Sequence, residues 1–241
     1  ASLAAQIATA CGAAPRQRVD DDLARMADDL KHCRPTDWNL VAALVEVAFD
    51  RPAELDHGTH VAGILGGAWP EPGEETGGES NVVWHEGMCP DIELYDFKVT
   101  GHHAEATEFA VIAAMRLIRH LNQKNDYTVI HGANLSLSIP HDVTNYACGS
   151  TPVCDEAEKL HRSGVVVVAA AGNDGYNEFQ TKRGFKSLHT TTSITDPGNA
   201  EEIITVGSTH RSAPHTYGVS YFSSRGPTGD GRMKPDLVAP G

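Results

Sequence analysis

Two histidines open a glycine-rich segment, D-H-G-T-H-V-A-G-I-L-G-G, which spans residues 56–67. His57 and His60 lie three residues apart, and glycines follow at positions 58, 63 and 66. Each glycine in a helix interior costs about 1 kcal/mol relative to alanine, so three of them need a compensating role. Close packing of a second helix against these small residues would supply that role. A histidine at the start of such a helix could act as a general base toward a nucleophile on another element.

Two other interpretations of this segment stay open. The histidines could be solvated side chains on a helix with a weak amphipathic pattern, or a metal-binding pair one helical turn apart. A zinc site is not favoured, because the segment has no H-E-x-x-H pattern and no carboxylate or third histidine at a fixed spacing. The segment alone therefore leaves the general base and the ordinary helix as alternatives.

The composition limits the class of protein. The length of 241 residues suits one large domain or a domain with a small appendage. The chain is 40% hydrophobic and carries a net charge of −13. A nucleic-acid groove needs a basic footprint, so we expect no nucleic-acid partner. No apolar run reaches the length of about 20 residues that spans a bilayer, so we expect a soluble protein without a membrane partner. An acidic surface is compatible with structural calcium, and no other cofactor is indicated.

The first residues and the cysteines say little about the compartment. Residues 1–15 are small and apolar, but no basic segment precedes them, so we do not interpret them as a signal peptide. Five scattered cysteines are too few for a disulfide scaffold. Cys148 and Cys154 flank G-S-T-P-V. A bridge between them and two free thiols are both consistent with the sequence.

The chain divides into two unequal parts. Residues 1–50 are expected to form a helical N-terminal segment, with one amphipathic helix over 20–33 and a second over 37–49 that Thr36 caps. After Asp56 the pattern changes. It predicts strands over 91–100, 127–138, 165–173 and 201–210, and helices over 105–125 and 155–164, the latter closed by a glycine.

Alternating strands and helices predict an α/β fold, a three-layer doubly wound sheet that is mainly parallel. The run V-V-V-V-A-A-A at 165–171 is expected to be the most buried strand, because a continuous β-branched run is typical of a strand covered on both faces. Functional sites in such sheets form beyond the carboxyl ends of the strands. We therefore expect a site near N-L-S-L-S and A-A-A-G-N.

Five segments, in this order, together resemble the motifs of the subtilisin-like serine peptidases. They are H-G-T-H-V-A-G-I-L-G-G, G-M-C-P-D-I-E-L-Y-D-F-K-V, N-L-S-L-S, V-V-V-V-A-A-A-G-N-D-G and Y-F-S-S-R-G-P with K-P-D-L-V-A-P-G. The resemblance implies a subtilisin-like peptidase domain over residues 56–241, C-terminally incomplete relative to the family pattern. It also implies hydrolysis of protein or peptide substrates through an acyl-enzyme.

The resemblance assigns roles to particular residues. His57 becomes the general base, and Asn173 becomes the oxyanion donor, a role worth about 3 to 4 kcal/mol in subtilisin itself. Backbone groups of two short segments would bind an extended substrate by strand pairing: Ser136, Leu137 and Ser138 on one side, Ala171 and Gly172 on the other. Ser138 stands where the family has glycine, which would narrow the first specificity pocket. We expect these segments, His57 and Asn173 to converge on one cleft.

Two motifs of the family are missing from these residues. The nucleophilic serine lies in a G-T-S-M-A motif, which does not occur here; Ser223 and Ser224 belong to another segment of the pattern. The triad acid lies in a D-S-G or D-T-G turn, which is also absent. Asp50 is a weak candidate for the acid, within about 24 Å of His57 along the chain. Asp56 is a weaker one, since it points elsewhere on a helix start.

Three functions are consistent with the sequence. The chain could represent, incompletely, an active endopeptidase, or a family member that has lost catalysis and binds extended peptides. It could also be a metal-binding regulatory domain that uses its 13 histidines, among them G-H-H at 101–103. We expect the 241 residues alone to show no peptidase activity, because a base and an oxyanion donor cannot form an acyl-enzyme without a nucleophile.

Overall fold

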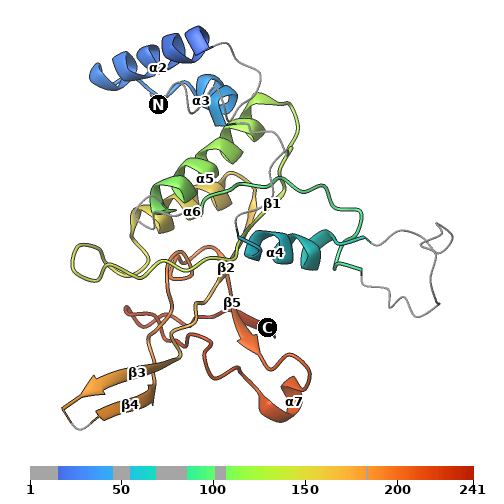
Figure 1. Cartoon of the computed structure of the whole chain (residues 1–241), viewed down its shortest axis with the longest axis vertical. Helices are drawn as coiled ribbons and strands as arrows, with labels where there is room; N and C mark the ends of the chain where they lie inside the picture. Colours follow the sequence, from blue (N-terminus) through green and yellow to red (C-terminus); the bar gives the residue numbers. More distant parts are fainter. Residues whose placement is uncertain (1–15, 46–54, 69–85, 101–106, 183) are drawn as a thin grey trace, which may run out of the picture. The chain divides into compact units, whose positions relative to one another are not determined.

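The computed structural model describes residues 16–45, 55–68, 86–100, 107–182 and 184–241 (Figure 1). The chain forms two compact units, residues 1–96 and residues 97–241.

The first unit contains three described helices: α2 (Arg16–Lys31), α3 (Trp38–Val45) and α4 (His57–Gly66). The helix expected over 20–33 is confirmed, and the helix expected over 37–49 is confirmed for residues 38–45. The expected cap is wrong by one position, because the backbone N–H of Asn39 donates to Asp37 Oδ1 at 3.1 Å. Asp37 directly precedes the first helical residue, and its carboxylate also suits the positive end of the helix dipole.

The second unit contains a four-stranded parallel sheet with the strand order β1-β2-β5-β6. Its strands are β1 (Gly132–Leu135), β2 (Val166–Ala170), β5 (Ile204–Thr209) and β6 (Leu237–Pro240). Each neighbouring pair is parallel. This sheet and its helices confirm the expected α/β class with a mainly parallel sheet.

Two helices lie side by side over the sheet, α5 (Thr107–Lys124) and α6 (Pro152–Arg162) (Figure 1). Side chains of both helices and of β2 form the buried core: Val111, Met115, Ile118, Val153, Ala157, Leu160, Val167 and Ala169.

The predicted glycine at the end of α6 is confirmed. Gly164 has a φ of +97°, and its N–H donates to the carbonyl of His161 at 2.9 Å.

The prediction that the run 165–171 is covered on both faces is wrong. The strand lies inside the sheet between β1 and β5, but its exposure alternates: Val167 and Ala169 are 1% exposed, whereas Val166 is 51% exposed. Strand β5 has as regular an alternation, with every second residue buried. The run of valines therefore reflects β-propensity, and the helices α5 and α6 bury only one of its faces.

Residues 91–100 form no strand, although their side chains alternate in polarity. Ile92, Leu94 and Tyr95 are 43–48% exposed, and no described strand pairs with this segment. Alternation gives a chain two faces, but a strand also needs a neighbour to complete its hydrogen bonds. The expectation of a strand here is therefore wrong.

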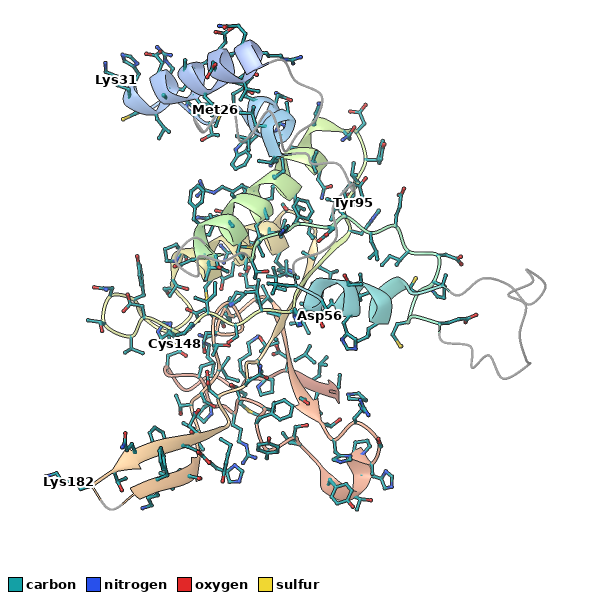
Figure 2. All side chains as sticks on the ribbon, in the orientation of Figure 1. Met26, Lys31, Asp56, Tyr95, Cys148 and Lys182 are labelled. Carbon is teal, nitrogen blue, oxygen red and sulfur yellow. The ribbon has the colours of Figure 1, made fainter. Side chains whose placement is uncertain are left out.

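A hairpin that the sequence reasoning did not predict follows directly on the A-A-A-G-N segment. Its strands β3 (Tyr176–Thr181) and β4 (Gly184–His189) are antiparallel. They project from the parallel sheet in Figure 1, and Lys182 lies at the tip in Figure 2. A short helix, α7 (Pro214–Tyr217), follows β5.

Candidate active site

The histidine segment forms the helix that the sequence predicts, and α4 begins at His57 directly after Asp56. His57 and His60 are both exposed. At the other end of the helix, the backbone N–H groups of Met88 and Cys89 donate to the carbonyls of Ile64 and Leu65 at 2.9 and 2.8 Å. The segment after residue 86 therefore docks on the last turn of α4.

One of the three glycines of α4 is explained by this docking. A Cβ on Gly66 would lie 2.6 Å from Ile92 Cγ2. Gly58 and Gly63 have no atom of the described residues within 4 Å of such a Cβ. The described residues therefore give no packing reason for glycine at these two positions.

The predicted substrate-binding segments leave two neighbouring strands of the sheet. Leu135, the last residue of β1, lies opposite Ala169 of β2 in the parallel register. Parallel strands end at the same edge, so residues 136–138 and residues 171–173 emerge side by side at the carboxyl ends. This is the place where ligands bind in open α/β sheets.

Thr195 joins these two segments. Ser138 Oγ donates to Thr195 Oγ1 at 2.8 Å. Thr195 Oγ1 in turn donates to the carbonyl of Ala171 at 3.3 Å, and the Thr195 N–H donates to the same carbonyl at 3.0 Å. Thr195 is only 4% exposed. Sequence reasoning missed this residue, because nothing in its local pattern marks a contact 57 positions away.

The turn that carries Asn173 is fixed from both sides. Gly172 has a φ of +107°, and a Cβ there would lie 2.5 Å from Thr195 Oγ1 and 2.9 Å from Ser224 Oγ. The N–H of Ser224 donates to the carbonyl of Gly172 at 2.9 Å. The N–H of Asp174 donates to Ser224 Oγ, also at 2.9 Å. Asn173 itself is exposed at the end of the strand, where its amide can reach a ligand.

The two serines of F-S-S-R-G-P are structural. Ser223 and Ser224 are 1% and 2% exposed. Ser223 Oγ accepts a hydrogen bond from the N–H of Ser208 at 3.0 Å, as Ser224 Oγ does from Asp174. Neither hydroxyl is placed to attack a bound peptide, which agrees with their assignment to another segment of the pattern.

The other candidates are placed as follows. His57 belongs to the first unit and Asn173 to the second, so their convergence on one cleft stays a prediction. Asp56 directly precedes α4 and makes no side-chain cap to it. Asp50 and the G-H-H segment lie outside the described residues. Among the described residues, no three or more His, Cys, Asp or Glu side chains group as metal ligands would.

The described cysteines, Cys33, Cys89, Cys148 and Cys154, are free thiols. Of the two interpretations of Cys148 and Cys154, the one with two free thiols is therefore confirmed, and the one with a bridge is wrong. Cys148 lies in the loop between β1 and α6 (Figure 2). Cys154 is buried, and this burial, followed by the charge of Asp196, raises the pKa of its thiol well above the usual value. None of the helices in the described ranges has the length and apolarity to cross a membrane.

Comparison with known proteins identifies the motif pattern. The model of a family described as the subtilase family matches residues 46–241. Serine protease AprX of Bacillus subtilis (strain 168) is 30% identical over 189 residues, which cover 77% of this chain and 37% of AprX. Subtilisin DY of Bacillus licheniformis is 30% identical over 133 residues, covering 55% of this chain and 39% of that protein. The chain thus spans well under half the length of these relatives.

Among solved structures, the S41 psychrophilic protease matches with a TM-score of 0.49 and 23% identity. The match covers 65% of this chain and 46% of that protein.

Proposed function

Because this chain belongs to the subtilase family, we propose that it acts as a serine endopeptidase domain. His57 is the general base that takes the proton of the nucleophilic serine. The Asn173 amide donates to the oxyanion of the tetrahedral intermediate. Base and oxyanion donor must both lie within a few ångström of one reacting carbon, so the proposal requires α4 to bring His57 to the carboxyl ends of β1 and β2.

The observation that carries the proposal is the pair of segments beside Asn173. Residues 136–138 and 171–172 leave neighbouring strands and are tied together through Thr195. These two segments are the walls of the proposed groove. Their backbone N–H and C=O groups can pair with an extended peptide between them, which gives affinity without requiring a particular sequence. A protein or peptide substrate held in this way presents a carbonyl near the exposed Asn173.

A peptide-binding protein without catalysis is the second candidate. The observation that favours it is that no D-S-G or D-T-G turn precedes the histidine segment in this sequence. Such a protein would keep the two walls and bind the same extended peptides. The two candidates differ in turnover and share the binding step.

The test is hydrolysis of casein and of an internally quenched decapeptide by the protein expressed from its full reading frame. We expect turnover that His57→Ala lowers by about 10⁴-fold or more, as loss of a triad member does in this chemistry. His60→Ala is the matched control, since His60 is an exposed histidine on the same helix, and it should retain activity.

A further variant tests the oxyanion role. Asn173→Ala should lower kcat by about 10² to 10³-fold with little change in KM, because the amide acts on the transition state. If the wild-type protein binds the decapeptide but does not cleave it, the peptide-binding candidate replaces the peptidase. Unchanged kcat in His57→Ala would contradict the assigned base.

A further inference from the structure

A buried carboxylate lies next to the proposed peptide-binding segments. Asp196 is 1% exposed. Its Oδ2 accepts hydrogen bonds from Thr151 Oγ1 at 2.8 Å and from His141 Nδ1 at 3.0 Å. Its Oδ1 accepts a third from Asn199 Nδ2 at 2.8 Å. Three donors from three parts of the chain therefore satisfy this group.

The burial makes these donors necessary. A carboxylate taken out of water without partners costs several kcal/mol, whereas one with a full set of donors is tolerated. An ionised carboxylate can only accept, so the Nδ1 of His141 carries the proton of this hydrogen bond. The side chain of His141 is itself 12% exposed. The requirement of Asp196 for donors thus fixes the ring of His141, and with it the chain that follows Ser138.

The backbone of Asp196 holds the same stretch of chain two residues earlier. The N–H of Ile139 donates to the carbonyl of Asp196, and the N–H of Asp196 donates to the carbonyl of Ile139, both at 2.9 Å. Thr195 contacts both walls of the proposed groove, through Ser138 on one side and Ala171 on the other. Residues 195–196 are therefore attached to the segment 138–141 at three successive points: Ser138, Ile139 and His141.

We propose that His141 is a positioning residue for peptide binding. Through Asp196 it holds residues 136–139 at a fixed distance from Ala171 and Gly172, so that both walls face the substrate in register. This inference rests on the proposed function, because it takes residues 136–138 and 171–172 as the substrate-binding walls. His141 touches neither the substrate nor the reacting atoms; it acts through Asp196.

The hydrogen bond between His141 and Asp196, with its effect on the segment 138–141, is called the brace below. The first test measures this brace without reference to activity. Amide hydrogen exchange is followed by NMR in wild type, His141→Leu and His141→Asn, all as the full chain. Loss of a charge-assisted hydrogen bond is worth about 1.5 to 3 kcal/mol, so exchange at Ile139 and Asp196 should rise at least about tenfold in His141→Leu. Amides inside β2, such as that of Ala169, should keep their rates. His141→Asn places an amide donor near the Nδ1 position and should restore slow exchange.

The second test measures the effect on peptide binding. With the quenched decapeptide, His141→Leu should raise KM about tenfold while kcat changes less than about twofold, and His141→Asn should return KM toward wild type. The dissociation constant of the uncleaved peptide replaces KM if the protein only binds. A merely structural defect would lower the folded fraction and kcat together and would not be rescued by asparagine.

The outcomes separate this inference from the proposed function. Unchanged exchange at Ile139 in folded His141→Leu overturns the brace. Raised exchange with unchanged KM or Kd overturns its role in binding. If the wild-type protein neither cleaves nor binds the peptide, the proposed function fails and the exchange rates alone decide on the brace. Should His141→Leu not fold, His141→Phe keeps a ring of similar size without a donor to the carboxylate, and unchanged exchange at Ile139 in folded His141→Phe overturns the brace.

Discussion

Ser138 Oγ donates a 2.8 Å hydrogen bond to Thr195 Oγ1, which bridges to the carbonyl of Ala171 on the opposite wall of the proposed groove. The serine side chain thus lies between the two segments that the sequence assigns to substrate binding. The subtilisin-like pattern has glycine at this position, so the hydroxymethyl group occupies volume that glycine leaves empty. We propose that this contact narrows the first specificity pocket.

Replacing Ser138 by glycine should therefore widen the pocket. We compare kcat/KM for two peptides, one with phenylalanine and one with alanine before the scissile bond. The phenylalanine-to-alanine ratio should rise about tenfold, because one or two carbon groups in a pocket change kcat/KM by about that factor. Ser150→Gly, in an exposed part of the loop before α6, is the matched control and should leave the ratio unchanged. An equal ratio in Ser138→Gly and wild type would show that the hydroxymethyl group does not line the pocket.

The turn at Gly172 offers a comparison of two glycines with positive φ. Gly172→Ala would put a Cβ 2.5 Å from Thr195 Oγ1, whereas a Cβ on Gly164 has no atom of the described residues within 4 Å. Both substitutions strain the backbone, which costs about 1 to 2 kcal/mol. Gly172→Ala adds a clash and should lower the free energy of unfolding, measured by urea titration, by at least twice as much as Gly164→Ala. Similar losses would mean that the turn relaxes around the added methyl group.

The ion pair between α5 and α6 should contribute to stability. Glu156 is 2% exposed and accepts hydrogen bonds from Arg116 Nε at 3.0 Å and from Arg119 Nη1. Breaking a buried pair typically costs 3–5 kcal/mol. Since the two arginines are partly exposed, we expect about 2 to 3 kcal/mol for Glu156→Gln.

The matched control for this pair is Glu158→Gln on the same helix. Glu158 pairs with Arg162, whose side chain is 59% exposed, and such pairs contribute about 1 kcal/mol or less. Urea titration of both variants gives the comparison. Equal effects would indicate that the burial of Glu156 adds nothing to its contribution.

Part of this fold could be predicted from sequence because the signals are local. The 3.6-residue period of apolar side chains predicted α2, α5 and α6, and the β-branched run predicted β2. The motif segments fell at the carboxyl ends of β1 and β2, where the fold class places a site. These predictions depend on side-chain pattern and chain order alone.

The remainder depends on which element lies next to which. Alternation in residues 91–100 could not show that no described strand pairs with them, and four valines could not show that α5 and α6 cover only one face of β2. Thr195 and His141 act through contacts more than 50 positions apart. The β3–β4 hairpin did carry a local signal, because alternating residues flank K-R-G, a turn-forming stretch.

The last prediction concerns the thiol of Cys154. Its pKa is raised by burial and by the charge of Asp196, so the folded protein holds the thiol protonated. The free energy this contributes is fully present below the pKa of an unfolded thiol, about 8.5, and declines above it by up to about 1.4 kcal/mol per pH unit, because the unfolded chain then releases a proton that the folded chain keeps.

We therefore expect the free energy of unfolding to fall between pH 8.5 and 10 more steeply in wild type than in Cys154→Val, by about 1 to 2 kcal/mol over that range. Urea titrations at both pH values measure this, and the difference between the two proteins removes the contribution of other titrating groups. Iodoacetamide at pH 8 should label the exposed Cys33 and Cys89 rapidly and Cys154 only on unfolding. Parallel pH profiles for wild type and Cys154→Val, with Cys154 labelled as fast as Cys33, would contradict the buried, protonated thiol.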